Sequence, residues 1–306
     1  MEMFDKNFLN EASEMEVAAE VAQMEQAILD KKEQGQESEA EMLELIKHLK
    51  FKPEAIEAEI QKEKELAEIK ARETEEAFQL QKEEGLCVET VGEEILDQLV
   101  LETNVVSGGT PGHYLDVTPY HFWCHVSRHN EGGVTRGSCS GSRASRKMFL
   151  YAHAQGDGLG WTDDNDVTTY GRFFYAFWPR KIGTVRVFLP VVTRGWYQIR
   201  SNDKWWNSKE AVVDLRASVR LYQNYWSPTV ERRLFRRADD NINESGRLDL
   251  YQAFYSASMA VGANKWVIAQ VSLRLRVETE GSGTLATLSF RNPDCIFIPG
   301  VRFEFA

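Results

Sequence analysis

The chain has 306 residues, and its net charge of −11 is unevenly distributed. Residues 1–100 carry 28 acidic and 11 basic side chains, whereas residues 101–306 carry 19 and 25. The overall acidity disfavours a nucleic-acid partner, because phosphates would be repelled at long range. No apolar run is long enough to span a bilayer, and the N-terminus lacks the pattern of a secretory signal peptide. We therefore expect a cytoplasmic protein, or one released without a classical signal peptide.

Residues 1–85 are predicted to form an acidic helical region for oligomerisation or docking. Apolar residues recur every three or four positions over residues 4–29, which is typical of one helical face. Gly35 predicts the end of this helix, Ser38 the start of a second, and Pro53 the first turn of a third. The apolar stripe of the third helix is too thin to establish a coiled coil. A local bundle of short helices, a self-associating stalk and a partly disordered arm are the alternatives.

Residues 104–306, which follow a hinge at residues 86–103, are predicted to form an antiparallel β-sandwich head with a jelly-roll-like pattern. Apolar and polar side chains alternate along residues 211–222 and 267–277, as the two-residue period of a strand requires. Helices do not alternate with the strands, so the fold class is α+β with segregated domains. Seven shorter strands are expected at 146–154, 170–178, 184–192, 195–200, 248–260, 284–291 and 295–305.

Arginine dominates the basic side chains of the β region, providing 20 of the 25 in residues 101–306. Arginine is suited to ion pairs and stacking at interfaces, whereas lysine is more solvated. We therefore predict that arginines on strand faces contact the acidic region of the same or a neighbouring subunit, and we expect a homo-oligomer. The RRLFRR run at residues 232–237 would be the best patch for the disfavoured nucleic acid.

Three tryptophans lie close together in residues 195–207, around a polar turn. Flat rings beside hydrogen-bonding side chains are typical of a sugar-binding surface. The more common alternative is that Trp196 and either Trp205 or Trp206 anchor the core or a subunit interface. The candidate carbohydrate site comprises Trp196, Tyr197, Asn202, Asp203, Trp205, Trp206 and Asn207.

Two acidic loops are weak candidates for a calcium site, because Ca²⁺ requires closely spaced oxygen ligands. Neither has the glycine and terminal glutamate of an EF-hand loop, and such side chains also cap their own backbone in turns. The candidate ligands are Asp163, Asp164 and Asp166 in the first loop, and Asp239, Asn241 and Asn243 in the second.

Three histidines, His121, His125 and His129, recur every four residues. On a helix they could share a zinc ion. The surrounding residues favour a strand, where four residues span about 13 Å, so one ion could not reach both ends. Cys124 would then face the other side of that strand.

The four cysteines, Cys87, Cys124, Cys139 and Cys295, lack paired metal spacing, and we expect them to be mostly reduced. The GSCSG run at residues 137–141 imitates a nucleophile elbow with Cys139 as nucleophile. A flexible Gly/Ser-rich loop is the simpler interpretation, since no helix is expected to follow. A hydrolase that uses Cys139 with His121 or His153 is therefore the least favoured alternative.

The sequence thus predicts a non-catalytic assembly or attachment protein, in which the helical region oligomerises or docks and the head binds a partner or a carbohydrate. A capsid-like or fibre subunit is the structural alternative. No cofactor is expected apart from the calcium considered above.

Overall fold

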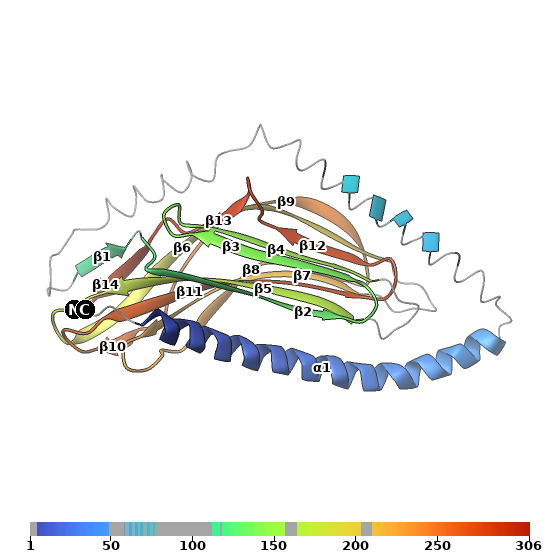
Figure 1. Cartoon of the computed structure of the whole chain (residues 1–306), viewed down its shortest axis with the longest axis horizontal. Coiled ribbons are helices and arrows are strands. Elements are labelled where there is room, and N and C mark those ends of the chain that lie inside the picture. Colours follow the sequence, from blue (N-terminus) through green and yellow to red (C-terminus); the bar gives the residue numbers. More distant parts are fainter. Residues whose placement is uncertain are drawn as a thin grey trace.

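The structure, a computed structural model, consists of one long helix and two β-sheets that face each other (Figure 1). In the part of the chain that it describes, fourteen strands form a nine-stranded and a five-stranded sheet, so the predicted β-sandwich is confirmed. The described residues are 5–48, ten separate positions between 58 and 76, 112–116, 118–156, 164–202 and 210–306.

All strand pairs of both sheets are antiparallel. The five-stranded sheet has the order β2 (His121–Asn130), β5 (Asp164–Phe177), β11 (Val267–Glu280), β7 (Ala211–Tyr222) and β8 (Val230–Asp239). The main path of the nine-stranded sheet is β1 (Gly112–Asp116), β14 (Val301–Phe305), β6 (Gly183–Asn202), β12 (Leu285–Ser289), β4 (Lys147–Gln155) and β13 (Cys295–Phe297). Strand β3 (Val134–Ser142) pairs with β4, while β9 (Asn241–Tyr255) and β10 (Met259–Val261) pair with β6.

The core lies between the two sheets and is built by the predicted alternation. In β7, Val213, Leu215 and Ala217 are fully buried in this core, whereas Arg216 and Arg220 of the same strand are only partly buried on the other side. The predicted strand at 211–222 has the observed bounds of β7. The two strands predicted at 184–192 and 195–200 form one continuous strand, β6.

Strand β3 was expected to be a flexible loop, and this prediction was wrong. Its glycines allow close packing: a Cβ atom on Gly137 would lie 2.5 Å from a methyl carbon of Val126, and one on Gly141 would lie 2.6 Å from the Phe122 ring. The GSCSG run therefore forms a strand that approaches its neighbours closely, with no following helix and no elbow.

Helix α1 (Lys6–His48) continues without a break through Gly35 and Ser38, so the prediction of several short helices was wrong over this range. One glycine inside a helix costs only about 1 kcal/mol, and the surrounding Glu, Lys, Gln and Ala residues favour the helix. The ten described positions between 58 and 76 are also helical. No helix in the described part of the chain has the length and apolar character needed to cross a membrane.

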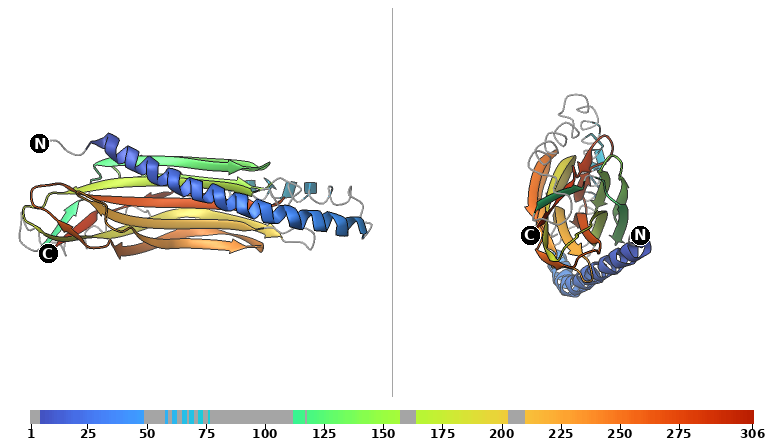
Figure 2. Two further views of the ribbon diagram at one scale, coloured as in Figure 1. Left: turned by 90° about the horizontal axis from the view of Figure 1, so that it is seen from below. Right: turned by 90° about the vertical axis from the view of Figure 1, so that its left-hand side faces the viewer.

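The first half of α1 packs on the outer face of the five-stranded sheet (Figures 1 and 2). Leu9 and Val17 are buried there against Trp123, Tyr170 and Phe174. The apolar stripe is thin, because Leu9, Val17 and Ile28 are the only buried apolar residues among the described side chains of α1. Polar contacts must therefore contribute to holding the helix.

Two glutamates of α1 supply these polar contacts. The Glu16 carboxylate lies 2.8 Å from guanidinium nitrogens of both Arg172 and Arg220. Glu20 accepts a hydrogen bond of 2.9 Å from the Tyr170 hydroxyl and pairs with Arg274 at 3.3 Å. The predicted contact between the acidic region and arginines on strand faces is thus confirmed within one chain.

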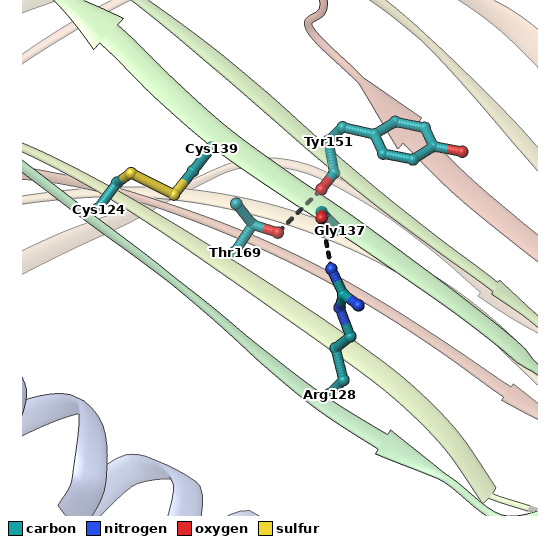
Figure 3. Close-up of a disulfide and its surroundings, with 6 residues drawn as sticks. All are labelled: Cys124, Arg128, Gly137, Cys139, Tyr151 and Thr169. Carbon is teal, nitrogen blue, oxygen red and sulfur yellow. Dashed lines mark hydrogen bonds between the residues drawn. A yellow bond between two sulfur atoms is a disulfide. The ribbon is translucent and has the colours of Figure 1, made fainter.

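A disulfide joins Cys124 of β2 to Cys139 of β3, with their Cα atoms 6.0 Å apart (Figure 3). The prediction of reduced cysteines was wrong for this pair, because consecutive strands bring the two residues into disulfide geometry. Cys295 is free and buried, and Cys87 lies outside the described residues. Since β2 and β3 belong to different sheets, the bond ties one edge of the sandwich.

Candidate functional site

A groove of about 400 Å³ lies on the outer face of the nine-stranded sheet, opposite the core. Side chains of β3, β4, β12 and β6 that point away from the core form its floor. Two residues from the acidic N-terminal region, Glu68 and Arg72, also line it. The floor consists of Val134, Arg136, Tyr151, His153, Gln155, Trp196, Gln198 and Thr287.

The register of the strands places these side chains in ordered rows. Arg136 lies opposite His153, His153 opposite Thr287, and Thr287 opposite Gln198, which gives one polar row across four strands. In the next row, Tyr151 and Trp196 flank Ser289. Two strand spacings separate these aromatic residues by about 10 Å. An aromatic pair therefore lies beside a row of hydrogen-bonding groups.

The imidazole of His153 is the most strongly perturbed group of the floor. Burial, together with the smaller effect of the positive charges of Arg136 and Arg291, lowers its pKa to about 4. Its Nδ1 atom lies 2.9 Å from the Thr287 hydroxyl, and its ring stacks parallel to that of Tyr151 at 6.4 Å. At neutral pH the ring is uncharged, so it offers one hydrogen-bond donor and one acceptor.

Only part of the predicted carbohydrate site lies in this groove. Trp196 does, but Tyr197 faces the core, where its ring lies 4.7 Å from that of Phe235. Asn202 is the last residue of β6 and pairs with Asn241. The other four predicted residues, Asp203, Trp205, Trp206 and Asn207, lie outside the described residues.

The remaining floor residues were missed, although part of their signal is present in the sequence. In residues 151–155, Tyr, His and Gln alternate with two alanines, which is typical of a strand with a polar outer face. The alternation does not show that Trp196, Gln198 and Thr287 lie beside them, because cross-strand pairing joins segments far apart in the chain.

Two of the described calcium candidates, Asp166 and Asp239, use their carboxylates for contacts within the protein. Asp166 pairs with Arg276 at 2.5 Å and accepts a hydrogen bond from Thr168, so its carboxylate already has a cation. Asp164 is buried at the start of β5, Asp239 caps the backbone of Asn241, and Asn243 lies in β9. Asp163 lies outside the described residues. Among those described, no group of three or more His, Cys, Asp or Glu side chains could hold a metal ion.

The three histidines lie on strand β2, as predicted, and have separate partners. His121 is 2.8 Å from the Asn10 side chain of α1, His125 lies beside Tyr170, and His129 is 3.3 Å from Glu131. Cys124 points to the other side of β2, toward Cys139. Because Cys139 is disulfide-bonded, it has no thiol that could act as a nucleophile.

No family model and no curated protein sequence matches this chain. Among solved structures it is similar to the enzymatically active domain of tailspike protein 4 from bacteriophage CBA120, with 4% identity and a TM-score of 0.20 over 64% of this chain and 21% of that one. It is also similar to a family 35 carbohydrate-binding module from Clostridium thermocellum, with 5% identity and a TM-score of 0.20 over 64% and 99%. A third structure is TmCBM61 in complex with β-1,4-galactotriose, with 8% identity and a TM-score of 0.17 over 57% and 86%. Likeness at this level carries no argument about the ligand of this chain.

Proposed function

We propose that this chain is a non-catalytic binding protein whose β-sandwich head holds a carbohydrate in the groove. The observation that supports this proposal is the pairing of Tyr151 and Trp196 with the adjacent polar row. Sugar rings present apolar C–H faces that pack on aromatic rings, and hydroxyl groups that require both donors and acceptors. Amide, imidazole and hydroxyl side chains, here Gln155, Gln198, His153 and Thr287, provide both.

The chemistry of the groove supports binding rather than hydrolysis. Glycoside hydrolysis commonly uses two carboxylic side chains that flank the scissile bond. Glu68 is the single carboxylic side chain among the described residues that line the groove. The neutral, hydrogen-bonded His153 is placed to orient a hydroxyl group.

Removal of the Trp196 ring tests this function. We expect Trp196→Ala to weaken binding at least tenfold for the glycan that binds best on a glycan array, because a stacked ring and its buried area are lost. Isothermal titration calorimetry measures the change, and circular dichroism verifies the fold. Trp178→Ala is the matched control, because Trp178 packs on Trp266 away from the groove. Equal losses in both variants, or an array without any hit for the intact protein, would remove the proposal.

We propose further that the acidic helical region has a docking role, which α1 fulfils on its own five-stranded sheet. The predicted homo-oligomer is a separate part of this proposal. Light scattering on the full chain tests it, and a monomer at micromolar concentration would contradict it.

A further inference from the structure

We infer that the groove selects an anionic carbohydrate, one that carries a carboxylate or a sulfate group, and that Arg136 pairs with this group. The inference rests on the proposed function, since it specifies the ligand class of the same groove. It follows from the charges around the floor, which are arranged to receive a negative group.

Arg136 is the cation of the groove floor that is placed to meet the ligand, and Arg72 of the acidic region also lines the groove. It is exposed on strand β3, lines the groove and lies opposite His153 in the strand register. A guanidinium group presents parallel N–H donors that match a carboxylate or sulfate in a bidentate pair. An exposed side chain at the end of the polar row can make this pair while the sugar ring packs beside Trp196.

A second guanidinium reinforces the positive potential. Arg291 lies over the Tyr151 ring, 4.0 Å from its centroid. Both Arg136 and Arg291 also lower the pKa of His153 in the floor. An anion in the groove would therefore be attracted by Arg136 and Arg72 on the lining and by Arg291 beside the Tyr151 ring.

The Asp294 carboxylate behind the aromatic row is paired with guanidinium groups of its own. Asp294 is held by both terminal nitrogens of Arg247, at 2.7 and 3.1 Å, and lies 3.6 Å from Arg194. Arg247 is the register partner of Trp196, so this cluster borders the groove. The Asp294 carboxylate is thus paired within this cluster.

Glu68, which also lines the groove, repels such a ligand, because its exposed carboxylate carries a negative charge as well. The groove therefore provides two substitutions with opposite expected effects. Loss of the Arg136 charge should weaken an anionic ligand, whereas loss of the Glu68 charge should strengthen it. A neutral sugar should respond to neither.

A glycan array with neutral, carboxylated and sulfated members provides the first test on the full chain. Hits that carry carboxylate or sulfate groups support the inference. Hits confined to neutral glycans overturn it and leave the proposed carbohydrate function standing. An array without hits overturns both. If neutral and acidic glycans both bind, titration of the substituted proteins decides whether Arg136 recognises the acidic group.

Titration calorimetry with the strongest acidic hit provides the second test. We expect Arg136→Gln to weaken binding about tenfold and to reduce its salt dependence, and Glu68→Gln to strengthen it about threefold. Arg232→Gln, on an exposed position of β8 outside the groove, is the matched control. Circular dichroism verifies that each variant is folded. An Arg136→Gln variant that binds as tightly as Arg232→Gln would overturn the inference, even where Trp196→Ala still abolishes binding.

Discussion

At the scale of one residue, burial of His153 in the floor of the groove makes the stability of the protein depend on pH. The side chain is buried, and its pKa is lowered from 6.5 to about 4. In the unfolded chain the imidazole has an ordinary pKa, so it takes up a proton at a higher pH than in the folded chain. Below about pH 6.5, protonation of His153 therefore favours the unfolded state. This effect grows until the pH approaches the pKa of His153 in the folded protein.

We expect this group alone to lower the free energy of unfolding by about 2–3 kcal/mol between pH 7 and pH 4.5. Urea unfolding at both pH values, on the intact protein and on His153→Gln, measures it. The glutamine variant should lose less stability over this interval, because glutamine does not titrate. Other acidic groups titrate in both proteins, so the difference between the two isolates His153. Equal losses in the two proteins would contradict the assignment.

The candidate site was predictable from the sequence only in part, and strand geometry explains why. Trp196 was identified because it belongs to an unusual cluster of tryptophans. Its neighbour Tyr197 was assigned to the same surface, although successive residues of a strand point to opposite faces. Gln198 is the residue that shares the face with Trp196. Tyr151 and His153 come from another part of the chain, and the required strand order, β4, β12 and β6, is not encoded locally.

At the scale of one element, α1 depends on its ion pairs because its buried apolar stripe is thin. Arg172 is only 2% exposed, so its charge needs the partner that Glu16 supplies. We expect Glu16→Gln to weaken the docking of α1 by about 1–3 kcal/mol, since Glu16 itself is partly exposed. Hydrogen exchange at the backbone amides of α1 should then become roughly five- to 150-fold faster.

The control for this prediction is Glu14→Gln, which removes the same charge from an exposed position of the same helix. It should leave the exchange rates nearly unchanged, because surface charges contribute little. The sandwich strands should keep their protection in both variants. Equal acceleration by Glu14→Gln and Glu16→Gln would show that helix charge in general, rather than this contact, holds α1.

Strands whose apolar and polar residues alternate clearly were predictable from the sequence. Elements whose conformation depends on packing against the rest of the protein were not. Strands β7 and β11 alternate strictly, and both were found where the pattern placed them. Strand β3 is rich in glycine and serine, which normally indicate a turn, and it becomes a strand because its glycines fit against β2. Helix α1 passes through Gly35, since one unfavourable residue does not outweigh its favourable neighbours.

At the scale of the whole molecule, described residues of the acidic region lie on both outer faces of the sandwich. Glu16 and Glu20 of α1 bind arginines on the five-stranded sheet. Glu68 lines the groove on the nine-stranded sheet, where Arg136 lies. On the five-stranded sheet, the uneven charge of the chain therefore corresponds to direct pairing of helix glutamates with strand arginines.

The two sheets are also tied at one edge, which makes the stability of the whole sandwich sensitive to reduction. Besides the Cys124–Cys139 disulfide, Arg128 donates a 2.8 Å hydrogen bond to the Gly137 carbonyl, and Thr169 donates one of 2.9 Å to the Tyr151 carbonyl (Figure 3). Neither hydrogen bond involves the sulfur atoms. We therefore expect the reduced protein to fold, with a lower free energy of unfolding.

For the sequence separation of 15 residues, the loss should be about 3 kcal/mol, because the disulfide restricts the unfolded chain. Urea unfolding with and without a reductant measures it, and Cys124→Ser/Cys139→Ser should match the reduced protein. The reductant should have no effect on that double variant, which controls for Cys87 and Cys295. If the intact protein unfolds at the same urea concentration with and without reductant, the bond does not stabilise the sandwich, and the edge is held by its hydrogen bonds and core packing alone.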